Sequence, residues 1–346
     1  MSSVYEEALY RTETEPDIEV GAVVERERVV EEMMGMYVTR RLVAVGDESD
    51  PIERRTLRAV GDAFEIDLID NPQWIAPSED NFDSNPASQW LYTEDPAQTS
   101  MQKWSRLFPS AKALYPLQRL DDGGRVLPGG VIDERANYLF TNMVDGIGLR
   151  ARARVMADML VEVSNTFRGE TLECVSLGCG AAVPDINATL RIQQATGADV
   201  NWHLYDISKD ALDFARELAD EAGIDQSTIS TFEGLYVRAF SKKPESAHVV
   251  DVLGLWEYLD DRTCVKLLKR SYKLLKPGGS FIASNMLSDR PQLEFNLRGV
   301  GWPSIIKPRS EEQLFAIVAA ADLDTESFTF TRSDDGVYGV MEIKKS

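Results

Sequence analysis

The second half of this 346-residue chain alternates short apolar runs with amphipathic helical stretches, and this alternation restricts the fold more than any other feature. Residues 172–177, 201–205, 229–232, 249–253 and 281–283 are short runs rich in apolar residues, as buried parallel strands are. Strands that alternate with helices indicate βαβ units with right-handed crossovers. The sequence therefore predicts an α/β fold with a doubly wound, Rossmann-like sheet.

Local signals place the ends of the helices between these strands. Pro184 suits the first turn of a helix, and Ser208 and Asp261 are predicted N-caps. Ser310 and Gln313 form a predicted capping box. Near the end of the chain, Asp334-Asp335-Gly336 separates two further apolar runs, which predicts an antiparallel C-terminal hairpin over 327–331 and 337–343.

The first 165 residues lack this regularity, so we expect two regions: a mainly helical N-terminal region, 1–165, covering the substrate, and a cofactor-binding domain, 166–346. One N-terminal helix is predicted from apolar residues at helical spacing, namely Val23, Val30, Met33, Met34 and Tyr37. A second is predicted from about residue 133 through Leu160, with a break near Gly146 and Gly148.

The amino-acid composition limits which classes of partner and cofactor the chain is expected to bind. The formal net charge of −20 disfavours nucleic acid, because such a surface repels phosphate backbones. No apolar run is long enough for a membrane span, and the acidic N-terminus lacks the order of a secretory signal, so we expect a cytoplasmic protein. With three cysteines and two histidines, neither a disulfide framework nor a metal site is expected. The oligomeric state is left open.

A glycine-containing loop follows the first predicted strand of the domain, in the segment Ser176-Leu-Gly-Cys-Gly-Ala-Ala182. It does not fit the nicotinamide fingerprint, because Val183 stands at the third glycine position, and no P-loop Gly-Lys-Ser/Thr follows. Asp206 ends the next predicted strand, where an acidic side chain can accept the hydroxyls of a ribose. Loop and acid together predict an adenosine-containing ligand.

These motifs resemble those of the class I S-adenosylmethionine-dependent methyltransferases. The resemblance spans Leu172 to Ile343, about half of the chain, and includes the turn at 275–279 and the final hairpin. It differs at Ser176, where the family usually has an acidic residue, and at Ala182, where glycine is frequent.

The resemblance implies S-adenosyl-L-methionine as the cofactor and assigns roles residue by residue. Asp206 would hold the ribose, and the other expected cofactor contacts are Gly178, Gly180, Ala182, Ile207, Glu233, Gly234 and Gly254. The segment Gly254-Leu-Trp-Glu-Tyr-Leu259 is also similar to a subgroup with the pattern GL[FW][DE]YL, which includes enzymes assigned to fatty-acid methyl esters.

Methyl transfer is an in-line displacement that depends on positioning and on the exclusion of water. Glu257 and Tyr258, after the fourth predicted strand, are the candidate catalytic residues; the alternative is a packing Tyr and a solvent-facing Glu. Candidate substrate contacts, each with a structural alternative such as a turn, core packing or surface pairing, are Asn285, Trp302, Arg150 and Arg152.

The sequence thus favours a methyltransferase acting on a small molecule, at oxygen, nitrogen or a carboxyl group. Three alternatives stay open: transfer of an aminocarboxypropyl or aminopropyl group from the same class of cofactor, a non-catalytic binding or interaction protein, and a nicotinamide oxidoreductase. The last is disfavoured by Val183 and by the closing hairpin.

Overall fold

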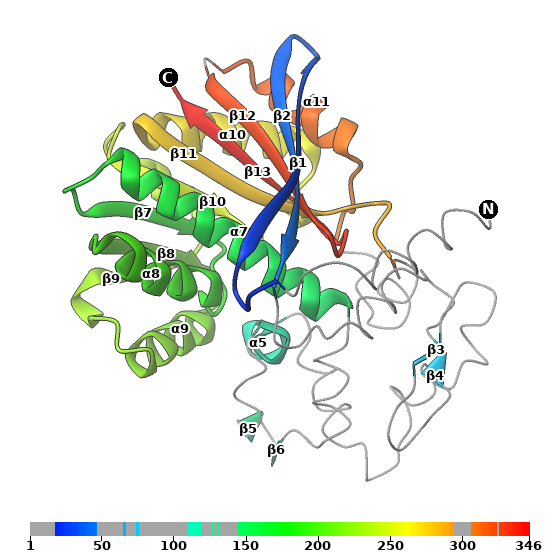
Figure 1. The fold of residues 1–346 in the computed structure, drawn as a ribbon. Coiled ribbons are helices and arrows are strands. Elements are labelled where there is room, and N and C mark those ends of the chain that lie inside the picture. Colours follow the sequence, from blue (N-terminus) through cyan, green and yellow to red (C-terminus); the bar gives the residue numbers. More distant parts are fainter. Residues whose placement is uncertain are drawn as a thin grey trace.

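A nine-stranded mixed sheet organises the chain (Figure 1). The computed structural model describes residues 18–46, 65–66, 74–75, 110–118, 126–127, 130–131, 144–291, 293, 306–323 and 325–346. The seven strands of the domain are β7 (Leu172–Leu177), β8 (Val200–Asp206), β9 (Ile229–Glu233), β10 (Ala247–Val252), β11 (Leu275–Met286), β12 (Thr325–Ser333) and β13 (Tyr338–Lys345).

The order of these strands is β9-β8-β7-β10-β11-β13-β12. Neighbours from β9 to β11 run parallel, whereas β13 lies antiparallel between β11 and β12. This arrangement confirms the predicted Rossmann-like sheet and its antiparallel hairpin. After β9 the chain returns to the other side of β7, so the direction of strand addition reverses between β7 and β10. Ligands of open α/β sheets bind at such a switch point, beyond the carboxyl ends of the strands.

Helices cover both faces of the sheet. The helices on one face are α7 (Val144–Thr166), α8 (Val183–Thr196) and α9 (Lys209–Glu221), and those on the other are α10 (Asp261–Leu274) and α11 (Glu311–Ala321). Figure 1 shows α7 and α8 crossing one face of the sheet. Each face buries a separate apolar core, one containing Trp202 and the other Phe281.

The predicted helix at residues 23–37 is wrong. These residues form β1 (Val23–Met33) and the start of β2 (Met36–Val45), a hairpin whose second strand pairs in parallel with β12. The turn is formed by Met34 and Gly35, both with positive φ, as a two-residue hairpin requires. Four β-branched valines and the pairing with β12 outweigh a spacing of apolar residues that also fits a helix.

Two smaller predictions need correction. Gly146 and Gly148 do not break α7, which continues to Thr166; at Gly148 an added Cβ would lie 2.6 Å from Cβ of Val337, so glycine permits close packing there. The N-cap of α10 is Asp260 rather than Asp261. The predicted cap at Ser208, the capping box at Ser310 and the helix start at Pro184 are confirmed.

Shorter elements complete the described residues. They are the helix α5 (Ala111–Gln118), the 3-10 turns η4 (Gln226–Thr228), η5 (Tyr236–Ser241) and η6 (Trp256–Tyr258), and the short strands β3 (Glu65–Ile66), β4 (Trp74–Ile75), β5 (Val126–Leu127) and β6 (Gly130–Val131). The division near residue 165 stays a prediction.

Candidate functional site

A cavity of about 630 Å³ lies at the switch point between β7 and β10. Its walls come from the loop after β7, the end of β8, the start of α8, the end of β10 and the N-terminal helix α5. The predicted cofactor residues on its walls are Gly178, Gly180, Asp206, Ile207, Gly234 and Gly254. Ala182 and Glu233 lie next to this wall in the chain and do not line the cavity.

The loop after β7 requires its glycines. Gly178 and Gly180 have φ values of 71° and 56°, in the left-handed region that glycine tolerates best. A Cβ at Gly178 would also lie 2.9 Å from Cβ of Leu255. Gly178 N–H donates to the carbonyl of Tyr205 at 2.7 Å, which ties the loop to β8. Ala182 adopts φ 52° at the start of α8, a conformation in which glycine would cost less.

Asp206 fixes the same loop from the side of β8. Its Oδ2 accepts the backbone N–H of Gly180 at 2.9 Å, and its Oδ1 accepts that of Ser208 at 2.9 Å. Each carboxylate oxygen has room for a second donor. Two backbone bonds therefore hold the side chain on the cavity wall while leaving acceptor capacity for a ligand hydroxyl.

The next residues form an apolar rim. Ile207 lines the cavity although 72% of its surface is exposed. Gly234 also lines the cavity, has φ 124°, and donates its N–H to the carbonyl of Asp206 at 2.9 Å. An exposed isoleucine beside a bare backbone is suited to cover one face of a flat ring.

Two buried carboxylates next to the glycine loop were not predicted from the sequence. Asp185 comes from the first turn of α8 and Asp251 from β10, where it pairs with Ser176 of β7. Ser176 Oγ donates to Asp251 Oδ1 at 3.0 Å, and all three residues line the cavity. Burial raises the pKa of Asp185 to about 7, and burial together with the neighbouring Asp185 raises that of Asp251 well above its ordinary value.

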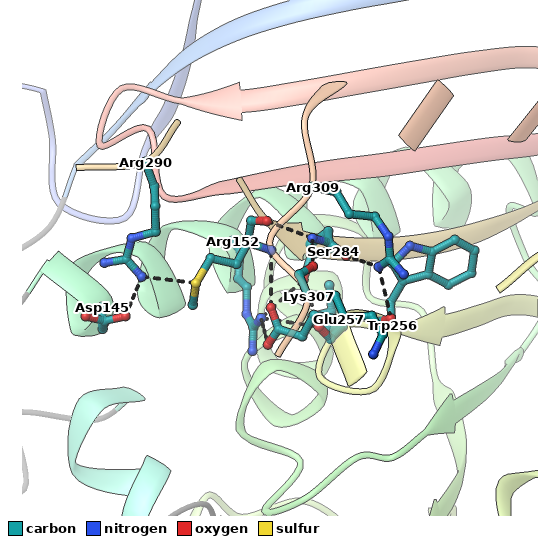
Figure 2. A network of polar contacts seen from close by, with 11 residues as sticks. Asp145, Arg152, Trp256, Glu257, Ser284, Arg290, Lys307 and Arg309 are labelled. Atoms are coloured by element: carbon teal, nitrogen blue, oxygen red, sulfur yellow. Dashed lines mark hydrogen bonds and ion pairs between the residues drawn. The ribbon is translucent and has the colours of Figure 1, made fainter. Parts of the chain in front are cut away.

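Arg152 of α7 lines the cavity near the end of β10, where it contacts Leu253 (Figure 2). Its Nη1 donates to the carbonyl of Leu253 and to Ser284 Oγ, both at 3.2 Å. Its guanidinium also stacks 4.4 Å from the ring centroid of Tyr338. Its buried Nε has no hydrogen-bond partner among the described residues.

Of the two candidate catalytic residues, Tyr258 lines the cavity and Glu257 does not. Tyr258 lines the cavity, and burial raises the pKa of its hydroxyl, so the phenol stays protonated. Glu257 lies behind the wall rather than facing solvent; it accepts the N–H of Met286 at 3.2 Å and lies 4.0 Å from Arg152. Burial raises the pKa of Glu257 as well.

The remaining candidate substrate residues do not line the cavity. Asn285 is enclosed by structural bonds: its amide donates to the carbonyls of Met286 and Lys307, and its Oδ1 accepts from Arg309 at 2.7 Å. Arg150 donates to the carbonyl of Leu117 at 2.8 Å and so joins α7 to α5. Trp302 lies outside the described residues.

Helix α5 covers part of the cavity. Ala111, Leu114 and Gln118 line it, and a Cβ at Gly180 would lie 3.8 Å from Ala111. The predicted N-terminal cover over the substrate, residues 1–165, stays a prediction. The described segments contain no group of three or more residues arranged to bind a metal, and none of their helices is long and apolar enough to cross a membrane.

Comparison with known proteins agrees with this geometry. Residues 175–279, from the glycine loop to the turn before β11, match the family model of a methyltransferase domain. Over these residues the chain is similar to methyltransferase domains. The match confirms the resemblance predicted from the sequence and supports S-adenosylmethionine as its cofactor.

No curated protein matches the chain, but solved structures do. A possible exported protein from Bordetella parapertussis is 16% identical, with a TM-score of 0.55 over 75% of this chain and 93% of that one, which supports the fold of the methyltransferase domain. The magnesium protoporphyrin IX methyltransferase of Synechocystis, with bound S-adenosylhomocysteine, is 12% identical, with a TM-score of 0.44 over 72% and 95% of the chains. Human N-acetylserotonin methyltransferase, in complex with S-adenosylmethionine, is 16% identical, with a TM-score of 0.41 over 79% and 76%.

Proposed function

We propose that the chain transfers a methyl group from S-adenosylmethionine to a small molecule bound in the same cavity. The observation that carries this proposal is the cavity at the switch point of the methyltransferase domain, lined by a glycine loop and by an aspartate bound to that loop. Its volume of about 630 Å³ lies within the range of small-molecule sites.

The adenosine would bind on the β8 side. Asp206 would accept hydrogen bonds from the ribose hydroxyls, and Ile207 and Gly234 would face the adenine. Gly178 and Gly180 let the ligand lie against the backbone of the loop because neither residue carries a side chain. Gly254, at the end of β10, extends this bare surface toward the acceptor.

The acceptor would bind near Tyr258, beneath α5. Catalysis here would depend mainly on holding the acceptor in line with the methyl group, an effect worth about 7–11 kcal/mol. Tyr258, protonated, would donate a hydrogen bond to the acceptor. Glu257 would act as a positioning residue, because its carboxylate lies 4.0 Å from Arg152 and contacts the backbone of Met286.

Calorimetry with the full chain tests the cofactor site. S-adenosylmethionine and S-adenosylhomocysteine should both bind, and Asp206→Ala should weaken each by about tenfold or more, equivalent to ~1.4 kcal/mol, while the protein stays folded. Unchanged affinity in this variant would contradict the placement of the ribose.

Labelling tests the reaction. The protein is incubated with methyl-labelled S-adenosylmethionine and a cell extract, and mass spectrometry follows the label and the spent cofactor. Methyl transfer yields a labelled product and S-adenosylhomocysteine. Release of methylthioadenosine would indicate transfer of an aminocarboxypropyl group instead, or of an aminopropyl group if the cofactor is first decarboxylated. Tight binding without any turnover would favour a non-catalytic protein.

A further inference from the structure

Asp185 and Asp251 are two buried acids without a balancing cation. Their residues are 3% and 2% exposed, and neither forms an ion pair with a lysine or arginine of the described residues. Asp185 contacts both Ser176 and Asp251. Two adjacent carboxylates in such a place cannot both ionise without large cost.

Each acid also has an oxygen left over. Asp185 Oδ1 and Asp251 Oδ2 receive no hydrogen bond from the described donors, although both side chains line the cavity. The one hydroxyl donor fixed on the pair is Ser176, at 3.0 Å from Asp251 Oδ1. A buried acceptor without a donor is destabilising. A proton shared between the two carboxylates would lower this cost.

The position of the pair suggests what replaces that proton. Asp206 marks the β8 side of the cavity, and Asp251 marks the β10 side, across the glycine loop of β7. An adenosine held by Asp206 would therefore extend its tail over the loop toward Asp185 and Asp251. The tail of the proposed cofactor is an amino acid, with one ammonium and one carboxylate.

We propose that Asp185 and Asp251 together bind the ammonium group of the cofactor's amino-acid tail, and that the pair releases its shared proton to solvent when this cation enters. The proposal rests on the proposed function. One positive charge enters and one proton leaves, so the net charge of the buried site is unchanged. Arg152, whose Nε is unpartnered on the same cavity, would receive the carboxylate of the tail.

The other titratable groups around the pair would not release the proton when the ammonium group binds. Cys174 on β7 and Cys179 in the loop are thiols whose pKa is raised well above the ordinary value by burial. Burial also raises the pKa of the phenols that line the cavity, Tyr205, Tyr236 and Tyr258. The remaining charged groups on the wall are Asp206 and Arg152. Among the described titratable residues that line the cavity, only Asp185 and Asp251 have a buried carboxylate oxygen without a hydrogen-bond donor.

Two ligands separate this inference from the proposed function. S-adenosylhomocysteine carries the amino-acid tail, and methylthioadenosine is the same nucleoside without it. Calorimetry on the full chain compares their binding to the wild type and to Asp251→Asn and Asp185→Asn. The control is Asp213→Asn, at an exposed residue of α9 that pairs with Lys209.

The expected result is selective. Each variant of the pair should weaken S-adenosylhomocysteine by about tenfold or more, while methylthioadenosine changes by less than about twofold. Asp206→Ala should weaken both ligands, and Asp213→Asn neither. Equal losses for the two ligands in the pair variants, or no loss for S-adenosylhomocysteine, would overturn the inference while leaving the adenosine site intact. Failure of both ligands to bind the wild type would overturn the proposed function and this inference together.

A measurement on the wild type needs no variant to fold. Titrations near pH 7 in two buffers with different enthalpies of ionisation report the protons released on binding. S-adenosylhomocysteine should release up to about one proton and methylthioadenosine close to none. Equal proton release for the two ligands would rule out the exchange.

Discussion

Two buried pairs of charged side chains lie near the carboxyl ends of the strands, and they differ in charge balance. Asp145 of α7 and Arg290, after β11, form an ion pair at 2.6 Å with side chains 1% and 0% exposed (Figure 2). Asp185 and Asp251 are as deeply buried but carry charges of the same sign. The first pair joins α7 to the residues after β11 and does not line the cavity at the switch point, whereas the second pair does. A balanced buried pair supports the fold, and an unbalanced one suggests a ligand of opposite charge.

The largest expected effect concerns the balanced pair. Arg290→Met should destabilise the protein by about 3–5 kcal/mol, because it leaves the carboxylate of Asp145 buried without its cation. Urea unfolding measures the loss. Arg262→Met, on the exposed side of α10, is the control and should change little. An Arg290→Met variant as stable as the wild type would remove the contrast between the two pairs.

The unbalanced pair should respond in the opposite direction. The pKa of Asp185 is raised from 3.8 to about 7 by burial, so the folded state loses stability as pH rises through that range. Asp251→Asn removes one of the two acids and should increase the free energy of unfolding above pH 7 by about 1–4 kcal/mol without ligand. The gain should shrink toward pH 4, where the acids are protonated in the folded state. A loss of stability at every pH would show that the pair is structural.

The fold was predictable from the sequence because its signals are local. A short apolar run such as 172–177 is a strand, and Ser208 and Ser310 cap helices by bonds to residues three positions away. The hairpin at 23–45 was not predictable in this way. Its valines fit a helical spacing, and the partner that selects the strand is β12, about 290 residues later in the chain.

The residues of the candidate site likewise fall into those with a local sequence signal and those without one. Gly178, Gly180 and Asp206 were found because a glycine loop and a strand-ending acid are recognisable within one βαβ unit. Asp185 and Asp251 were missed, since a lone acid in the first turn of a helix is ordinary and an acid within an apolar strand has no meaning until its neighbour is known. Their only sequence signal was indirect: Ser176 stands where the family usually has an acid.

The loop above the unbalanced pair gives a third prediction. Gly178→Ala places a Cβ 2.9 Å from Leu255 Cβ and strains a residue with φ 71°. We expect binding of S-adenosylhomocysteine to weaken by about tenfold to a hundredfold, ~1.4–2.7 kcal/mol, by calorimetry. Gly223→Ala is a matched control, because φ there is 75° but nothing lies within 4 Å of the added Cβ. If both substitutions weaken binding equally, backbone strain rather than contact at the cavity is responsible.

The smallest effect is the dependence of affinity on pH, and it tests most directly whether the unbalanced pair meets a cation. The ammonium binds the deprotonated pair, so the affinity for S-adenosylhomocysteine should rise by about tenfold between about pH 6 and 8. Methylthioadenosine brings no cation and should bind with nearly constant affinity over this range. In Asp185→Asn only Asp251 remains, without the neighbouring carboxylate that helps to raise its pKa, so the rise should move to lower pH and flatten over this range. A rise of the same size for methylthioadenosine would assign the titration to the adenosine side of the cavity. The difference in charge balance between the two buried pairs would then no longer explain why one pair binds a ligand and the other does not.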